Sequence, residues 1–138
     1  MRVDDGMKES QEILFKNDFV KKIGAEIITT GNELKKQEIV DFSRKLDIDA
    51  LYEYVLAVKA DTDAWLEGLF YDDCKKTFTQ GDKNRIIALG VVFDDENAKW
   101  LIDYWCSKDI FGLIKMPLSR HWIMHIEAAN RIKAKITK

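Results

Sequence analysis

The chain has 138 residues, of which 46% are hydrophobic and 33% are charged, and its formal net charge is -2. This size and balance fit one folded domain over residues 1–138 and exclude a disordered chain. Because charges of both signs are interleaved, the sequence argues against nucleic-acid binding, which needs a basic surface. The first ten residues lack the apolar segment of a signal peptide, and no run of about 18 apolar residues is available to span a bilayer. We therefore expect a soluble cytoplasmic protein with no membrane partner.

The first half of the chain shows helical periodicity in three segments. Apolar residues share one helical face over 7–23 and again over 33–46, and between them Thr29, Thr30 and Gly31 indicate a connector, with Asn32 as the predicted cap of the second helix. The clearest helix follows Asp47 and is expected to end near Phe70. Its apolar positions recur at alternating steps of four and three, as in a helical bundle: Leu51, Val55, Val58, Thr62, Trp65 and Leu69.

The second half begins with a predicted turn or short helical turn over 71–73, and a loop containing Gly81 is expected over 77–84. The run RIIALGVVF at 85–93 is predicted to be irregular, because a strand there would have no neighbour to pair with. A helix capped by Asp94 or Asp95 should reach Ser107, and a last helix should run over 110–136 with Pro117 near its start. We expect an all-α fold, an up-down bundle of the four-helix type.

The only two histidines of the chain, His121 and His125, occupy one stripe of this last helix, which is expected to face the core. Side chains four residues apart stack on one helical face, so both imidazoles can reach a single ion, and zinc or nickel accepts such ligands. The alternative is that both are partly buried and hydrogen-bonded to neighbours. Because there is no third histidine, a third ligand must be a carboxylate, a cysteine, a water or a group from another chain.

Two stretches resemble the DinB-like (YfiT-like) family. Residues 116–133, MPLSRHWIMHIEAANRIK, resemble its last helix, and residues 38–69 with the following YDDC resemble its connector and third helix. The resemblance implies a bacterial four-helix bundle in which a histidine of the second helix and an HxxxH pair of the last helix hold a divalent metal. It also implies hydrolase or low-molecular-weight thiol transferase chemistry on an unspecified small molecule. His121 and His125 carry over as metal ligands.

The chain departs from the family at its beginning. The family's first helix and its ligand histidine have no counterpart, and residues 2–5 resemble those that follow that histidine, so the ligand would fall at or before Met1. We expect a bundle that is incomplete at the N-terminus, with an apolar strip that favours a homodimer or an exchanged helix. The alternative is a non-catalytic bundle or dimerisation module that has lost the complete metal site. The charge balance disfavours a DNA-binding regulator.

Other candidate residues each have a functional and a structural interpretation. Cys74 and Cys106 match no metal spacing and are expected to be reduced; Cys106 is either a reactive or a packed thiol. Arg120 either orients an anionic substrate or forms a surface ion pair. Four acidic residues near the N-terminus either supply a carboxylate ligand or form a solvated face: Asp4, Asp5, Glu9 and Glu12. Four tryptophans either line a ligand pocket or fill the core: Trp65, Trp100, Trp105 and Trp122.

Overall fold

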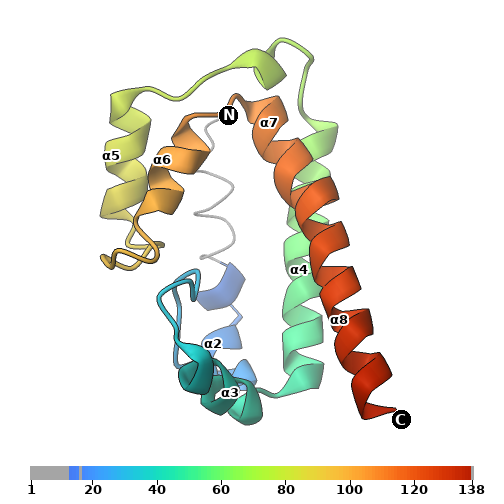
Figure 1. Cartoon of the computed structure of the whole chain (residues 1–138). Coiled ribbons are helices and arrows are strands. Elements are labelled where there is room, and N and C mark those ends of the chain that lie inside the picture. The colour runs from blue at the N-terminus through green and yellow to red at the C-terminus, as the bar shows by residue number, and fades with distance from the viewer. Residues whose placement is uncertain (1–12, 16, 138) are drawn as a thin grey trace.

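The computed structural model describes residues 13–15 and 17–137, and over this part it is helical, with one isolated antiparallel bridge between Thr77 and Asp109 (Figure 1). The predicted all-α class is confirmed. The elements are α2 (Phe19–Ile23), α3 (Lys36–Lys45), α4 (Ile48–Glu67), the 3-10 turn η1 (Asp73–Lys75), α5 (Gln80–Ala88), α6 (Trp100–Cys106), α7 (Ile110–Lys115), the π-helical segment η2 (Met116–His121) and α8 (Trp122–Ile136).

The long helix α4 begins where the sequence predicts. The Asp47 carboxylate caps it by accepting a hydrogen bond of 2.9 Å from the Ala50 amide, which satisfies one of the amides that a helix start leaves unpaired. The helix ends at Glu67 rather than near Phe70. Gly68 is its C-cap, with its amide 3.2 Å from the Trp65 carbonyl, so the last predicted turn is replaced by a tighter one.

Two details of the first half differ from prediction. The single helix expected over 7–23 is interrupted by a turn at Asn17 and Asp18, and Asp18 has a φ of 58°, which a continuous helix does not allow. Asn32 caps no helix. Instead α3 starts after Lys35, whose amide donates to the Glu38 carboxylate at 2.7 Å. The expectation for residues 7–12 lies outside the described residues.

The loop predicted over 77–84 is wrong, because α5 occupies most of it. Thr79 and Asp82 form a reciprocal capping box: the Thr79 amide donates to the Asp82 carboxylate at 2.9 Å, and the Asp82 amide donates to the Thr79 hydroxyl at 3.2 Å. The irregular run predicted over 85–93 is wrong for 85–88, which belong to α5, and is confirmed for 89–93. Gly90 supplies the φ of 65° at the end of α5. Asp95 forms a turn by accepting from the Asn97 amide at 2.8 Å, so α6 starts only at Trp100.

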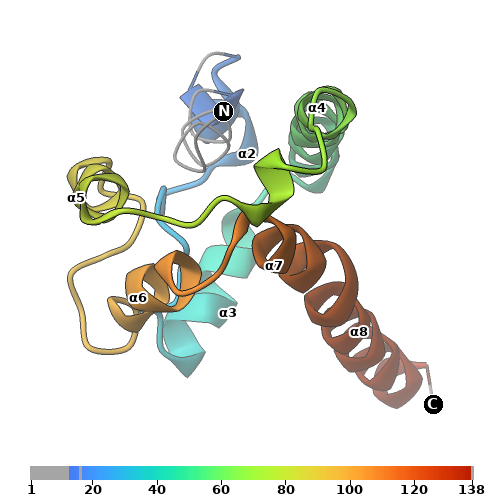
Figure 2. The ribbon, with the colours of Figure 1, turned by 90° about the horizontal axis from the view of Figure 1, so that it is seen from above.

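The buried side chains form two small clusters. In one, Phe19 and Ile23 of α2 lie with Ile13 against α4. In the other, Ile86 of α5 packs with Val91 and with Ile102 of α6. Figure 2 shows α4 and the α5–α6 pair on different sides of the molecule. Over the described part of the chain the helices therefore do not enclose one common core, and the DinB-like four-helix arrangement stays a prediction.

The last helix runs over 110–136, as predicted, in the three consecutive segments α7, η2 and α8. Its start is anchored: Asp109 caps it by accepting from the Gly112 amide at 2.7 Å, and the amide of buried Ile110 donates to the Lys76 carbonyl at 3.1 Å. Pro117 lies in the π-helical segment. A proline has no amide hydrogen to donate and crowds the preceding turn, so a wider turn accommodates it inside a helix.

Candidate functional site

His121 ends η2 and His125 lies one turn later in α8. Their imidazole rings are stacked, with centroids 4.4 Å apart and planes inclined by 27°. The i, i+4 spacing therefore brings the two rings together, as the sequence predicts. Zinc and nickel accept imidazole nitrogens as ligands, and rings this close are within reach of one ion after side-chain rotation. The π-helical segment η2, which ends at His121, is a type of helix distortion that is frequent at functional sites.

The predicted core-facing position of the pair is wrong for this structure. Every residue from Arg120 to Thr137 is exposed, and both histidines are among them. The interpretation as partly buried structural histidines does not hold either, since it needs neighbours that cover the rings. Periodicity identified the residues that share a face, but the packing of α8 against other helices does not follow from it.

The structure does not complete the metal site. Over residues 13–15 and 17–137, no group of three or more histidine, cysteine, aspartate or glutamate side chains is placed to hold a metal ion. The four acidic candidates of the N-terminal segment, Asp4, Asp5, Glu9 and Glu12, lie outside the described residues. Within the described residues, the histidine pair thus has no third side chain of these types placed beside it.

The remaining predicted residues are dispersed. Arg120 is exposed in η2 beside His121. Of the tryptophans, Trp105 packs on the α5–α6 cluster, while Trp100 and Trp122 are 51% and 56% exposed. The ring nitrogen of Trp65 in α4 is buried and has no hydrogen-bond partner in the described structure. With the four rings distributed over α4, α6 and α8, the tryptophan-lined pocket that the sequence allowed is not formed by them together.

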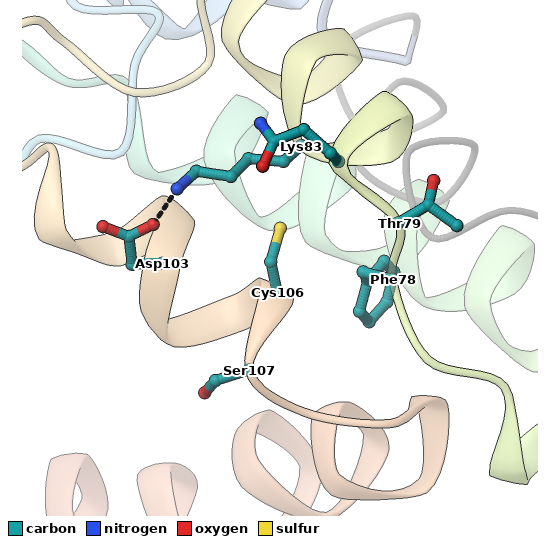
Figure 3. A pocket seen from close by; sticks show the side chains of 7 residues that line it. Phe78, Thr79, Lys83, Asp103, Cys106 and Ser107 are labelled. Atoms are coloured by element: carbon teal, nitrogen blue, oxygen red, sulfur yellow. Dashed lines mark hydrogen bonds and ion pairs between the residues drawn. The ribbon is translucent and has the colours of Figure 1, made fainter.

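A shallow pocket between α5 and α6 was not anticipated. Figure 3 shows the Cys106 sulfur pointing from α6 toward α5, between Phe78 and the ion pair of Lys83 with Asp103. The pocket could not be predicted from the sequence, because a loop was expected where α5 lies. The signal that identifies α5 is the T-x-x-D spacing of Thr79 and Asp82, which is a helix-start pattern.

The Cys106 thiol is expected to react slowly in the folded protein. Partial burial raises the pKa of this thiol above its ordinary value, and the Lys83 ammonium opposes that shift only in part. Since the thiolate is the nucleophile, a raised pKa lowers the reactive fraction at neutral pH. In a Cys74→Ser background, iodoacetamide should label Cys106 severalfold more slowly in native protein than in urea, measured by mass spectrometry. Lys83→Gln should slow it further; faster labelling of the native form would contradict the inert interpretation.

Comparisons with known proteins add no assignment. No family model matches the chain, and neither the curated proteins nor the solved structures contain a match.

None of the described helices combines the length and the apolar character needed to cross a membrane. Cys74 and Cys106 are both free thiols. The site thus has to be interpreted from its own residues.

Proposed function

We propose that the protein binds a divalent metal ion, zinc or nickel, through His121 and His125. The observation that carries this proposal is the stacked pair of imidazoles, 4.4 Å apart and open to solvent on α8. A bound ion replaces the water around both rings, and the helix already holds them in proximity, so little side-chain ordering is needed. The remaining ligands would come from waters, from the acidic N-terminal segment or from another chain.

The resemblance to DinB-like proteins adds a reaction class to this proposal. A zinc ion with an open position acidifies a bound water or stabilises a thiolate, which are the nucleophiles of a hydrolase and of a thiol transferase. The chain's own contribution would be to hold the ion through His121 and His125, with Arg120 beside them as a cation for an anionic small-molecule substrate. A cytoplasmic location belongs to the same proposal, and the two free thiols are compatible with it.

Metal binding is testable without a substrate. Protein prepared without a histidine tag is titrated with zinc or nickel chloride by calorimetry. His121→Ala and His125→Ala are each expected to weaken binding at least about tenfold, since even residues that only support metal ligands have effects of that size.

The matched control is Asn130→Ala, a change at an exposed residue of the same helix that is not part of the pair. It should leave the affinity unchanged within about twofold, as expected for a position that does not touch the site. If wild-type protein takes up less than about a tenth of an equivalent of either metal, or if the histidine variants bind as tightly as Asn130→Ala, the proposal is wrong.

A second candidate function is a helical self-association module, and the exposure of α8 favours it. Trp122, Ile126 and Ile132 are all more than half exposed, and apolar surface of this extent on one helix indicates a contact with another molecule. A homodimer is compatible with metal binding, and it is also the form that a module without catalysis would take. A measurement of the molar mass in solution tests whether the chain self-associates.

A further inference from the structure

Helix α8 has an apolar stripe that nothing in the described structure covers. Trp122, Ile126, Ile132 and Ile136 are 56%, 51%, 62% and 78% exposed, and Ala129 lies between them on the same face. His125 lies beside Ile132 at one edge of this stripe, and His121 lies beyond that edge. Isolated helices of this length are marginal in water, and most helical stability in proteins comes from packing an apolar face. The stripe is therefore expected to pack against another surface.

A second uncovered stripe lies on α4. One face of this helix packs on α2, but Ile48, Tyr52, Val55 and Leu56 are 66%, 64%, 44% and 47% exposed. Their spacing places them side by side on one face of the N-terminal half of α4. At a rise of about 1.5 Å per residue, α4 is roughly 30 Å long and α8 roughly 22 Å. The exposed strip of α4, over 48–56, therefore covers about half the length of the strip on α8.

The two helices carry opposite charge. Helix α4 contains five acidic residues and one lysine, whereas α8 contains three basic residues and one glutamate. Two copies of α8, each with a net positive charge, would repel each other, and two copies of α4, each with a net negative charge, would do the same. Contact between an α8 and an α4 brings opposite signs together, and such complementarity selects the partner and suppresses like-charge pairings.

The total exposed surface gives a further measure of what is left uncovered. The chain exposes 10043 Å² for a mass of 16.1 kDa, whereas a folded monomer of that mass exposes about 7,400 Å². The excess is more than the roughly 800 Å² per partner that a standard interface removes, and it reaches the range of obligate dimers. The molecule therefore has enough uncovered surface for a stable dimer.

Within one chain, α8 is directed away from α4. In Figure 1 the two helices overlap, but Figure 2, seen from above, shows α8 leading outward from the end of α7 while α4 stands apart. The Ile110 amide, bonded to the Lys76 carbonyl, ties the start of α7 to the residues that follow η1. The occupant that its charge favours for the α8 stripe is α4 of a second copy.

We propose that the protein is a two-fold symmetric homodimer in which α8 of each copy packs on α4 of the other. The apolar stripes meet at the centre, and Lys133, which lies on the same face of α8 as the stripe, faces the acidic flank of α4 that includes Glu67. Because a two-fold axis generates the contact twice, each substitution acts at two places. This proposal specifies the surfaces of the self-association proposed above and depends on that association, but not on metal binding.

The first test compares two isoleucines of α8 by sedimentation equilibrium, with EDTA present to remove metal. Wild-type protein is expected at twice the chain mass of 16.1 kDa. Ile126→Ser, on the stripe, should weaken the dimer at least about tenfold, since burying one such side chain contributes about 1.5–3 kcal/mol. Ile123→Ser is the control, because Ile123 is 58% exposed and lies off the stripe. Equal effects of the two changes would overturn the proposed interface.

The second test exchanges the charges. Lys133→Glu/Lys135→Glu makes α8 acidic, and Asp63→Lys/Glu67→Lys makes α4 less acidic, so each variant alone should be monomeric. Mixing the two should restore a dimer, because in the mixed species the acidic α8 of one variant meets the added lysines on α4 of the other, while the second contact pairs an unchanged α8 with an unchanged α4. Circular dichroism of each variant checks that both are folded. If the mixture stays monomeric although both variants are folded, the α8–α4 pairing is wrong.

These outcomes separate the interface from the self-association itself. A wild-type protein that is monomeric up to about 100 μM, well above the dissociation constants of stable dimers, overturns both the self-association and the α8–α4 interface. A monomer in which the α8 changes alter only the thermal stability would indicate packing within one chain. A wild-type dimer that is unaffected by Ile126→Ser and by both charge variants overturns only the α8–α4 contact. Because EDTA is present throughout, none of these results bears on the metal proposal.

Discussion

Replacing Phe19 by alanine is expected to lower the free energy of unfolding by about 3–5 kcal/mol, the usual range for removing a buried aromatic ring. The Phe19 side chain is 5% exposed, and its ring meets that of Tyr54 edge to face with centroids 5.4 Å apart. This contact joins α2 to α4 in the cluster with Ile13 and Ile23. Urea denaturation followed by circular dichroism measures the loss as a shift of the midpoint at constant slope.

Phe15→Ala provides the matched control. Phe15 lies four residues earlier and is 50% exposed, so the same truncation there should cost less than about 1 kcal/mol. Similar losses at both positions would show that Phe19 does not occupy the buried position described. A loss at Phe19 that leaves the zinc affinity unchanged would in addition indicate that the α2–α4 cluster and the histidine pair are energetically independent.

The sequence predicts those features of the fold that depend on neighbouring residues. The segment Asp47-Ile48-Asp49 precedes a long periodic stretch, and a carboxylate there satisfies the first amides of a helix, so the start of α4 could be predicted to this segment; the structure has Asp47 as the cap. The last helix was bounded equally well, because Asp109 caps it and its apolar spacing persists to Ile136. In both cases the determining interactions lie within four residues along the chain.

Features that depend on distant contacts were not predicted. The α5 segment QGDKNRIIA contains a glycine and few residues of strong helix propensity, so its sequence favours a loop over a helix. The deep burial of Ile86 against Val91 and Ile102 adds stabilisation that a propensity scale does not include. In the same way, Asp18 adopts a left-handed conformation that the periodicity of 7–23 gives no reason to expect.

The candidate site was predictable in part for the same reason. The stacking of His121 on His125 follows from the helical repeat alone, and it is observed. Their environment does not follow, because a stripe of Trp122, Ile126 and Ile132 indicates that a partner surface is needed without specifying which one. The charges of α4 and α8 supply that information only once the structure shows both stripes to be exposed.

Ile86→Ala is expected to lower the free energy of unfolding by about 2–5 kcal/mol. The Ile86 side chain is 1% exposed and is the largest fully buried side chain among the described residues. Truncation removes its contacts with Val91 and Ile102 and leaves a cavity that the short helices α5 and α6 can fill only by moving together. Urea denaturation followed by tryptophan fluorescence is a suitable measurement, since Trp105 packs on the same cluster.

The neighbouring Ile87 provides the control for this experiment. Ile87 is 54% exposed, so Ile87→Ala should change the stability by less than about 0.5 kcal/mol, or raise it slightly through the better helix propensity of alanine. Adjacent isoleucines with such different effects are expected where one side chain points inward and the next outward, as the structure has them. Comparable effects of the two substitutions would contradict the burial of Ile86 between α5 and α6.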